Sequence, residues 1–304
     1  MWFKNLRVFR LTQAWALTED QLAEQLQAFC FNPCGHLDLF RYGFTPPLGT
    51  DSNQLVHSTN GRLMICAKRQ DKILPSGVIK EHLEEKVVQI ETSEQRKLGR
   101  KEKQSLKDEI IFSLLPKAFT RSRLDFAYID PKKNWIIVNS ASAKRAEDLM
   151  SKLREALGSL PCIPLTTKHL PTQTMTRWVR EASVGAELEL GDECELTANK
   201  DGRVIRCKKQ DLTASEIRNH LDLGMQVNKL GLIWKESVEM MIDDQLSIKR
   251  LKFDGSITDP SDEKQTETKA EQFDLDFSIM ALELDALLHI LIKQLGGLEA
   301  SNSA

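Results

Sequence analysis

The sequence predicts an α+β fold built from two similar β-β-α-β-β-α halves with mixed or antiparallel sheets and a projecting helical lobe. Short alternating segments indicate strands, and apolar residues three and four positions apart indicate helices. A repeated segment relates the two halves. We expect the first half at residues 1–75 and 120–165, the lobe at 76–119, and the second half, with a C-terminal helix, at 166–304.

The internal repeat is the strongest of these observations. The segment GRLMICAKRQD at residues 61–71 returns as GRVIRCKKQD at residues 202–211. Further along the chain, Ile79, His82 and Leu83 match Ile217, His220 and Leu221. In both copies a strand ends in a cationic segment directly before a helix, so the order of elements repeats as well.

Local signals define the elements of the first half. Thr18 and Gln21 form a capping box that begins a helix, and Ser142 and Gly158 bound another. Alternating or apolar runs predict strands at residues 2–11, 37–40, 55–56, 62–68, 124–129 and 135–138. Residues 159–173 contain three of the ten prolines and are expected to link the halves.

The lobe is predicted as a helix from Ser76 to Leu115 that Gly99 breaks into a helical hairpin. Its first apolar stripe consists of Val78, Leu83, Val87 and Ile90. The stripe fades in residues 96–107, which carry six basic residues and one acidic residue. This basic run is either part of a binding lobe or simply a solvated helix face.

The second half has its own strands and helices. A hairpin is expected at residues 229–234 and 238–242, followed by a cationic strand, SIKRLKF, at 247–253. Thr213 with Glu216 predicts the start of a short helix that Gly224 ends, and a short helix is expected at 176–182. The acidic segment Asp259 to Asp276 is expected to be a flexible linker to a last helix at 273–295, whose wide apolar face suits both a sheet and a partner.

Bulk properties narrow the class of protein. The 304 residues are 41% hydrophobic and 28% charged, with a net charge of −2, so any polyanion site requires segregated charge. No apolar run is long enough for a membrane span, and the N-terminus lacks a signal-peptide pattern, so we expect a cytoplasmic protein with no membrane partner. Six cysteines show no CxxC pairs, and CFNPCGH at 30–36 lacks a fourth zinc ligand. No metal or cofactor is expected.

The first candidate polyanion site follows the lobe. Pro116 ends the helix, and Lys117, Phe119, Arg121 and Arg123 come directly after it. Cationic residues around one large ring suit a nucleic acid, which offers phosphates and flat bases. The alternative is that Phe119 packs into the core, the usual position of a phenylalanine.

The repeated strands provide the second candidate site. The cationic residues are Lys68 and Arg69 in the first copy, and Arg206, Lys208, Lys209 and Gln210 in the second. A cationic strand end beside a helix N-terminus attracts phosphate, and Gln210 can also hydrogen-bond a base edge. Lys249 and Arg250 add another cationic strand. The alternative is a solvated outer face.

No enzyme signature is found. The phosphate-loop, GxSxG, HExxH and GxGxxG patterns are absent from the sequence. The adjacent pair Asp243 and Asp244 lies at a predicted hairpin turn, and Glu84 and Lys86 lie on a predicted helix. We therefore predict a binding protein rather than an enzyme, with a metal-dependent nuclease as the alternative.

Several long segments of the chain are distinctive: MWFKNLRVFRL, GFTPPLG, ICAKRQDKILPSGVIK, SLKDEIIFSLLPKAF, SASAKRAEDLMSKLREALGSLPCIPL and IRCKKQDLTASEI. Through these segments the chain resembles the recombination-associated RdgC family along essentially its whole length. The resemblance implies a nucleoid-associated homodimer, closed into a ring around duplex DNA, that binds without sequence preference and opposes RecA. Single-stranded DNA remains an open alternative, as does a scaffold that binds the recombinase directly.

The resemblance also suggests which residues contact DNA. The family's contact positions fall on Lys117 and Phe119 in the lobe and on Lys209 and Gln210 in the second repeat. The family often has arginine where this chain has Lys117, and a lysine cannot make the bidentate phosphate contact of an arginine. With twofold symmetry each basic residue would act twice, and binding would depend strongly on salt.

Overall fold

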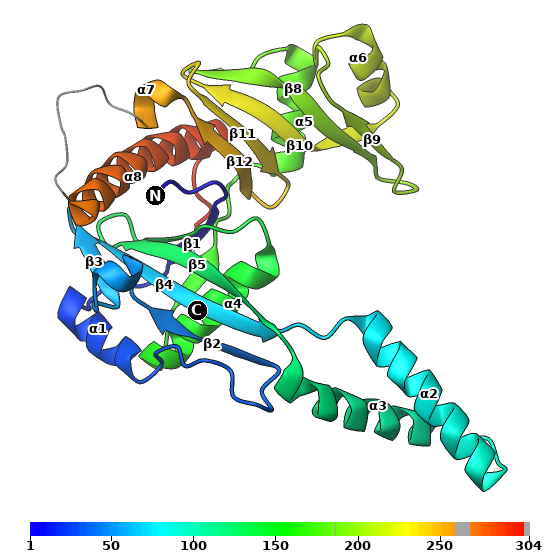
Figure 1. The fold of residues 1–304 in the computed structure, drawn as a ribbon. Helices are drawn as coiled ribbons and strands as arrows, with labels where there is room; N and C mark the ends of the chain where they lie inside the picture. The colour runs from blue at the N-terminus through cyan, green and yellow to red at the C-terminus, as the bar shows by residue number, and fades with distance from the viewer. Residues whose placement is uncertain (186, 259–267, 301–304) are drawn as a thin grey trace.

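A computed structural model describes residues 1–185, 187–258 and 268–300. Within these residues the strands form two sheets, one of seven strands and one of five, and every named strand pair is antiparallel. We call them the first sheet and the second sheet. Helices accompany both sheets, so the α+β prediction is confirmed (Figure 1).

The first sheet has the order β2-β4-β5-β6-β1-β7, with β3 also paired to β4. Its strands are β1 Arg7–Leu11, β2 Phe40–Thr45, β3 Val56–Thr59, β4 Arg62–Lys72, β5 Thr120–Asp130, β6 Trp135–Val138 and β7 Cys162–Pro164. Helices α1, Glu19–Gln27, and α4, Ala143–Leu157, cover one face. Leu22 and Leu26 of α1 and Leu149 and Leu153 of α4 are fully buried there.

The lobe lies between β4 and β5 in the chain. It consists of α2, Ser76–Glu94, and α3, Arg100–Leu114, followed by a 3₁₀ turn, Leu115–Lys117. Gly99 is the N-cap residue of α3, so the predicted break is confirmed. No residue of α2 is buried, because each helix of an isolated hairpin has only one neighbour to pack against. The predicted stripe therefore stays partly exposed.

The second sheet has the order β12-β11-β10-β8-β9. The strands are β8 Leu188–Ala198, β9 Val204–Cys207, β10 Met225–Trp234, β11 Val238–Asp243 and β12 Ile248–Phe253. Helix α5, Pro171–Glu181, packs against β10, and α6, Ser215–Asp222, lies at the β9 side. A one-turn helix, α7 Gly255–Thr258, follows β12.

The last helix, α8 Lys269–Gln294, lies between the two sheets (Figure 1). Its buried residues share one core with Met64 and Tyr128 of the first sheet and with Leu230 and Trp234 of the second. The wide apolar face of this helix is thus explained by two sheets of the same chain. The first sheet is covered on both faces, by α1 and α4 on one side and by α8 on the other.

Many local predictions are confirmed. Thr18 forms its capping box, Ser142 and Gly158 bound α4, and both predicted hairpins form. Several boundaries move: β1 begins at Arg7, β2 runs from Phe40 to Thr45, and α5 begins at Pro171. The predicted link at 159–173 includes β7, an edge strand of the first sheet.

Two predictions are wrong. Thr213 does not cap α6, because its amide and hydroxyl both donate to Asp211 and Ala214 is the N-cap residue. Residues 269–276 of the acidic segment are helical, since Thr268 and Glu271 form a capping box; residues 259–267 lie outside the described part. In both copies the repeated strand precedes a helix, as predicted, but the two strands differ in pairing, because β4 is paired on both sides whereas β9 is an edge strand.

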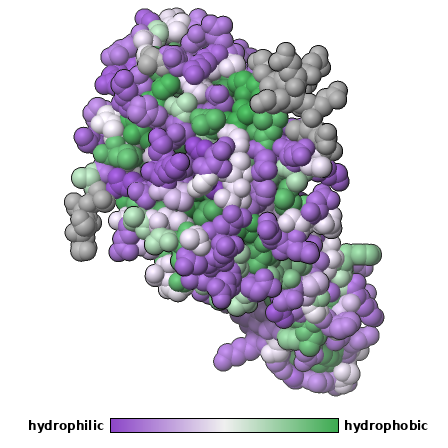
Figure 2. Space-filling view, turned by 90° about the vertical axis from the view of Figure 1, so that its left-hand side faces the viewer, coloured by the Kyte–Doolittle hydropathy of each residue, from purple (hydrophilic) through white to green (hydrophobic). Residues whose placement is uncertain are grey.

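The outline of the molecule is an arch. The lobe and the second sheet extend to the same side of the first sheet and α8, the right-hand side in Figure 1. The opposite side is mostly hydrophilic, with apolar side chains in separate small groups (Figure 2). Within the described residues, no helix is long and apolar enough to cross a membrane.

Candidate nucleic-acid interface

The first group of predicted residues meets at the base of the lobe. In the β4–β5 ladder Arg69 lies opposite Arg123, and Asp71 lies opposite Arg121. Opposed residues of an antiparallel pair point to the same face, so these charged side chains share one face of the sheet. Lys68 and Gln70 lie on the other face, where the Lys68 ammonium is 4.8 Å from the centre of the Phe31 ring.

Carboxylates neutralise part of this charge. Asp71 forms ion pairs with Arg69 at 2.8 Å and Arg123 at 3.8 Å. Arg123 also reaches the buried Asp125, which holds Arg145 in addition. By contrast, Lys117 and Arg121 form no ion pair within the described part of the chain. These two residues are therefore available to bind an anion at the base of the lobe.

Phe119 separates the two available cations and projects from the surface. Its side chain is 85% exposed, so the alternative of a core position is excluded within this chain. Its backbone carbonyl accepts a hydrogen bond from the Ile73 amide at 2.8 Å, which closes the base of the lobe. The ring is held on a fixed backbone and is free to stack on a flat partner.

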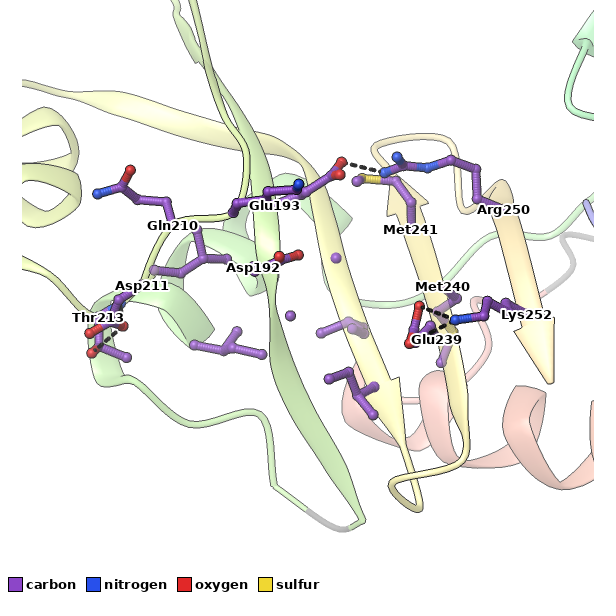
Figure 3. Close-up of a pocket in the computed structure, with 17 residues that line it drawn as sticks. Asp192, Glu193, Gln210, Asp211, Thr213, Glu239, Met240, Met241, Arg250 and Lys252 are labelled. Carbon is purple, nitrogen blue, oxygen red and sulfur yellow. Dashed lines mark hydrogen bonds and ion pairs between the residues drawn. The ribbon is translucent and has the colours of Figure 1, made fainter. Parts of the chain in front are cut away.

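Part of the second group lines a hollow on the open face of the second sheet, with a volume of about 1020 Å³ (Figure 3), whereas Arg206, Lys208 and Lys249 lie outside its lining. Gly191 of β8 and Gly231 of β10 form its floor. A Cβ atom on Gly191 would lie 3.0 Å from the Gly231 carbonyl carbon, so neither strand can carry a side chain there without a shift. Lys209, Gln210 and Arg250 line this hollow, so the structure brings these predicted residues together.

The hollow is mixed in charge. Arg250 binds Glu193 across the sheet at 2.6 Å, and Lys252 binds Glu239 at 3.3 Å (Figure 3). The Arg250 guanidinium, through its hydrogen bond, holds the pKa of Glu193 below its ordinary value. The charge of Arg250 is therefore largely neutralised by Glu193 of the same chain.

Arg206 and Lys208 differ in whether a carboxylate neutralises their charge. Arg206 binds Glu195 at 2.7 Å, and Lys229 binds the other oxygen of that carboxylate at 2.7 Å. Burial of Glu195 opposes its ionisation, but the two cations outweigh burial and its pKa lies below the ordinary value. Exposed Lys208 and Lys209 have no ion pair within the described residues. The backbone amide of Gln210 donates a hydrogen bond to the Asp192 carbonyl oxygen at 3.0 Å, and this bond fixes the segment against β8.

Lys249 has a structural partner. Its ammonium lies 2.7 Å from the carboxylate of Asp243, which is buried. Asp243 also accepts hydrogen bonds from the amides of Gln245 and Ser247, so it holds the β11–β12 turn. Asp243, half of the acidic pair noted in the sequence, is thus engaged in the fold.

A basic hollow beside the first group was missed. Arg145 and Lys144, from the first turn of α4, join Arg69 and Arg123 around Phe40. The Arg69 guanidinium stacks 4.0 Å from the Phe40 ring centre. The sequence feature that could have indicated this hollow is the basic pair Lys144 and Arg145, which begins two residues after the Ser142 cap. No local pattern in the sequence predicts that this pair lies next to β4. Among the described residues, no group of three or more histidine, cysteine or acidic side chains is placed to hold a metal.

Comparison with known proteins agrees with the resemblance noted in the sequence. A family model described as “Putative exonuclease, RdgC” matches residues 1–298. The chain is 46% identical over 298 residues to proteins named “Recombination-associated protein RdgC” from Yersinia pestis (strain Pestoides F) and Yersinia enterocolitica serotype O:8. These matches cover 98% of this chain and 98% of each relative.

Proposed function

We propose, from the premise that the chain belongs to the RdgC family, that it binds DNA without sequence preference as a ring-shaped homodimer around the duplex. By occupying DNA in the nucleoid it limits RecA-dependent recombination. This proposal gives a physical meaning to the association with recombination in the names of its relatives.

The observation that carries the proposal is the exposed Phe119 between two unpaired cations. Lys117 and Arg121 can reach phosphates while the ring stacks on a base or an equivalent flat surface. Lys208, Lys209 and Gln210 supply a second cationic segment on the second sheet. Contacts of this kind go to the DNA backbone and carry no sequence information.

The homodimer is supported by the exposed apolar residues of the lobe. Val78, Val88 and Phe112 are 39%, 63% and 58% exposed, and no other part of the described chain covers them. The arched outline places the lobe and the second sheet on one side, as a ring made of two such chains requires (Figure 1). The hydrophilic face in Figure 2 suits the outer surface of that ring.

Salt-dependent DNA binding tests the proposal. Fluorescence anisotropy with two unrelated duplexes should give similar affinities that fall steeply with salt, because bound lysines and arginines release counterions. Replacing Lys117, Arg121, Lys208 and Lys209 by alanine should weaken binding to both duplexes alike. Each removed contact should lower the slope of log affinity against log salt by about one.

The matched control is Lys269→Ala. It removes an exposed charge, paired with Asp51, at the start of α8 on the far side of the molecule. This variant should keep the wild-type slope. Binding of wild-type protein that is independent of salt, or a loss confined to one duplex sequence, would contradict backbone contact. Sedimentation analysis should give a dimer.

The description of the matching family as an exonuclease favours a second candidate, which we take to be a metal-dependent nuclease. A nuclease of this class needs carboxylates that hold Mg²⁺ near the scissile phosphate. Incubating end-labelled duplex with the pure protein and Mg²⁺ separates the two candidates. Degradation that co-purifies with the protein and stops on chelation would establish the nuclease; retention of intact DNA supports the binding protein.

A further inference from the structure

Two thiols face each other next to the second cationic segment. Cys194 of β8 and Cys207, the last residue of β9, are direct partners in the antiparallel ladder. Directly opposed residues have Cα atoms about 4.5–5.5 Å apart, and disulfides span about 4.4–6.8 Å. A bond between these two cysteines therefore needs little movement of the backbone.

The two thiols differ in accessibility. Cys194 is buried, with 3% exposure, and burial together with the neighbouring Cys207 thiol raises its pKa. Cys207 is half-buried on β9, an edge strand that pairs only with β8. An oxidant can therefore reach Cys207 from the edge of the sheet, whereas Cys194 is shielded from solvent.

The position of the pair links it to the proposed DNA contact. Lys208 follows Cys207 directly, and Lys209 has a left-handed backbone with φ of 51°. Gln210 is already fixed to β8 by the hydrogen bond from its backbone amide to the Asp192 carbonyl oxygen. The β8–β9 ladder holds the other end at Cys207. A covalent bond there would keep this edge of the ladder from opening, so Lys208 to Gln210 would be held more firmly at both ends.

We propose that Cys194 and Cys207 form a reversible disulfide in the presence of a peroxide, and that this bond fixes the Lys208–Gln210 segment. The Cys207 thiol loses its proton, and the thiolate attacks one oxygen of the peroxide; the O–O bond breaks, a sulfenic acid forms, and the departing hydroxide takes up that proton to become water. The Cys194 sulfur then attacks the sulfenic sulfur, and its proton departs with the hydroxyl as water. The two thiols lose two electrons and two protons, and hydrogen peroxide is reduced to two waters. A dithiol reverses the bond by exchange.

Mass spectrometry of the full chain tests the bond itself. Dilute hydrogen peroxide should remove two hydrogens, a loss of about 2 Da, and a cross-linked peptide should join Cys194 to Cys207. Dithiothreitol should restore the mass. Cys194→Ala should abolish the cross-link and leave Cys207 to gain oxygen instead. Cys162→Ser, which removes a half-buried thiol opposite Leu11, should leave the cross-link intact. A wild-type protein that only gains oxygen, or links other cysteines, would overturn the proposal.

Hydrogen exchange tests the effect on the segment without DNA. Amides of residues 208–210 should exchange more slowly after oxidation and recover with dithiothreitol; unchanged exchange would refute the second half of the proposal. The effect of the disulfide on DNA binding rests on the proposed function. If that function holds, the oxidised protein, with its segment fixed, should bind duplex about threefold more tightly than the reduced protein. If neither redox form binds DNA while the cross-link forms, the DNA-binding proposal fails and the thiol site stands.

Discussion

Neighbouring carboxylates decide how much positive charge each cationic residue presents. Arg206 and Lys208 are two residues apart and both exposed, yet only Arg206 is bound to Glu195. A cation that already has a carboxylate partner gains less from a phosphate, because the existing contact must first be broken. Residue type and exposure alone therefore overestimate the binding surface.

Glu195→Gln tests this balance. The change should release Arg206 and Lys229 from the shared carboxylate and strengthen duplex binding, with a salt slope steeper by about one. Lys208→Ala should have the opposite effect. The measurement is anisotropy with a labelled duplex across a salt series.

Glu187→Gln is the control for that series, because it removes an exposed carboxylate whose partner, Lys235, lies at the β10–β11 turn. It should leave the slope unchanged. An equal gain from both glutamate variants would mean that net charge, and not the local pair, controls affinity.

At the scale of elements, the lobe depends on two carboxylates that organise its turn. Glu102 accepts from Arg96 at 2.6 Å and from the Gly99 amide at 2.8 Å, and these contacts lower its pKa to about 2. Glu91 accepts from the Leu98 amide at 3.0 Å, a bond that lowers its pKa as well. Carboxylates whose pKa is lowered by folding stabilise the folded lobe only while they are ionised.

The lobe should therefore loosen in acid. Its stabilisation is fully present above the ordinary glutamate pKa of about 4.3 and is lost as pH falls through about 2 for Glu102. Amide signals of residues 96–102 followed by NMR should shift over this range before those of the sheets. Glu102→Gln should produce the loosening at neutral pH, whereas Glu84→Gln, on an exposed pair with Lys80, should not. An acid-insensitive turn would contradict the assignment.

The elements also show what could be read from sequence. The hairpins, the Thr18 capping box and the Gly99 break depend on residues close in the chain, so local patterns predicted them. The edge position of β9 and the place of α8 between two sheets depend on distant partners. The same holds for the site: the pattern identified Arg250 and Lys249, but not that Glu193 and Asp243 form ion pairs with them.

At the scale of the whole molecule, α8 makes the two sheets one cooperative unit. Its buried face belongs to a single core that includes residues of both sheets. Further contacts tie its N-terminal half to the first sheet, where His57 and Thr59 each lie 2.6 Å from Asp274. Separate unfolding of either sheet would expose this face to water, so we expect the two sheets to unfold together.

A substitution in α8 should therefore destabilise both sheets together. Leu284 is fully buried, and Leu284→Ala should lower the free energy of unfolding by about 3 kcal/mol through lost burial and a cavity. Urea unfolding followed by tryptophan fluorescence and far-UV circular dichroism should remain one coincident transition at a lower midpoint. Leu282→Ala, on the exposed face two residues earlier, should change stability by less than about 0.5 kcal/mol. Two separate transitions would show that the sheets fold independently and that α8 belongs energetically to only one of them.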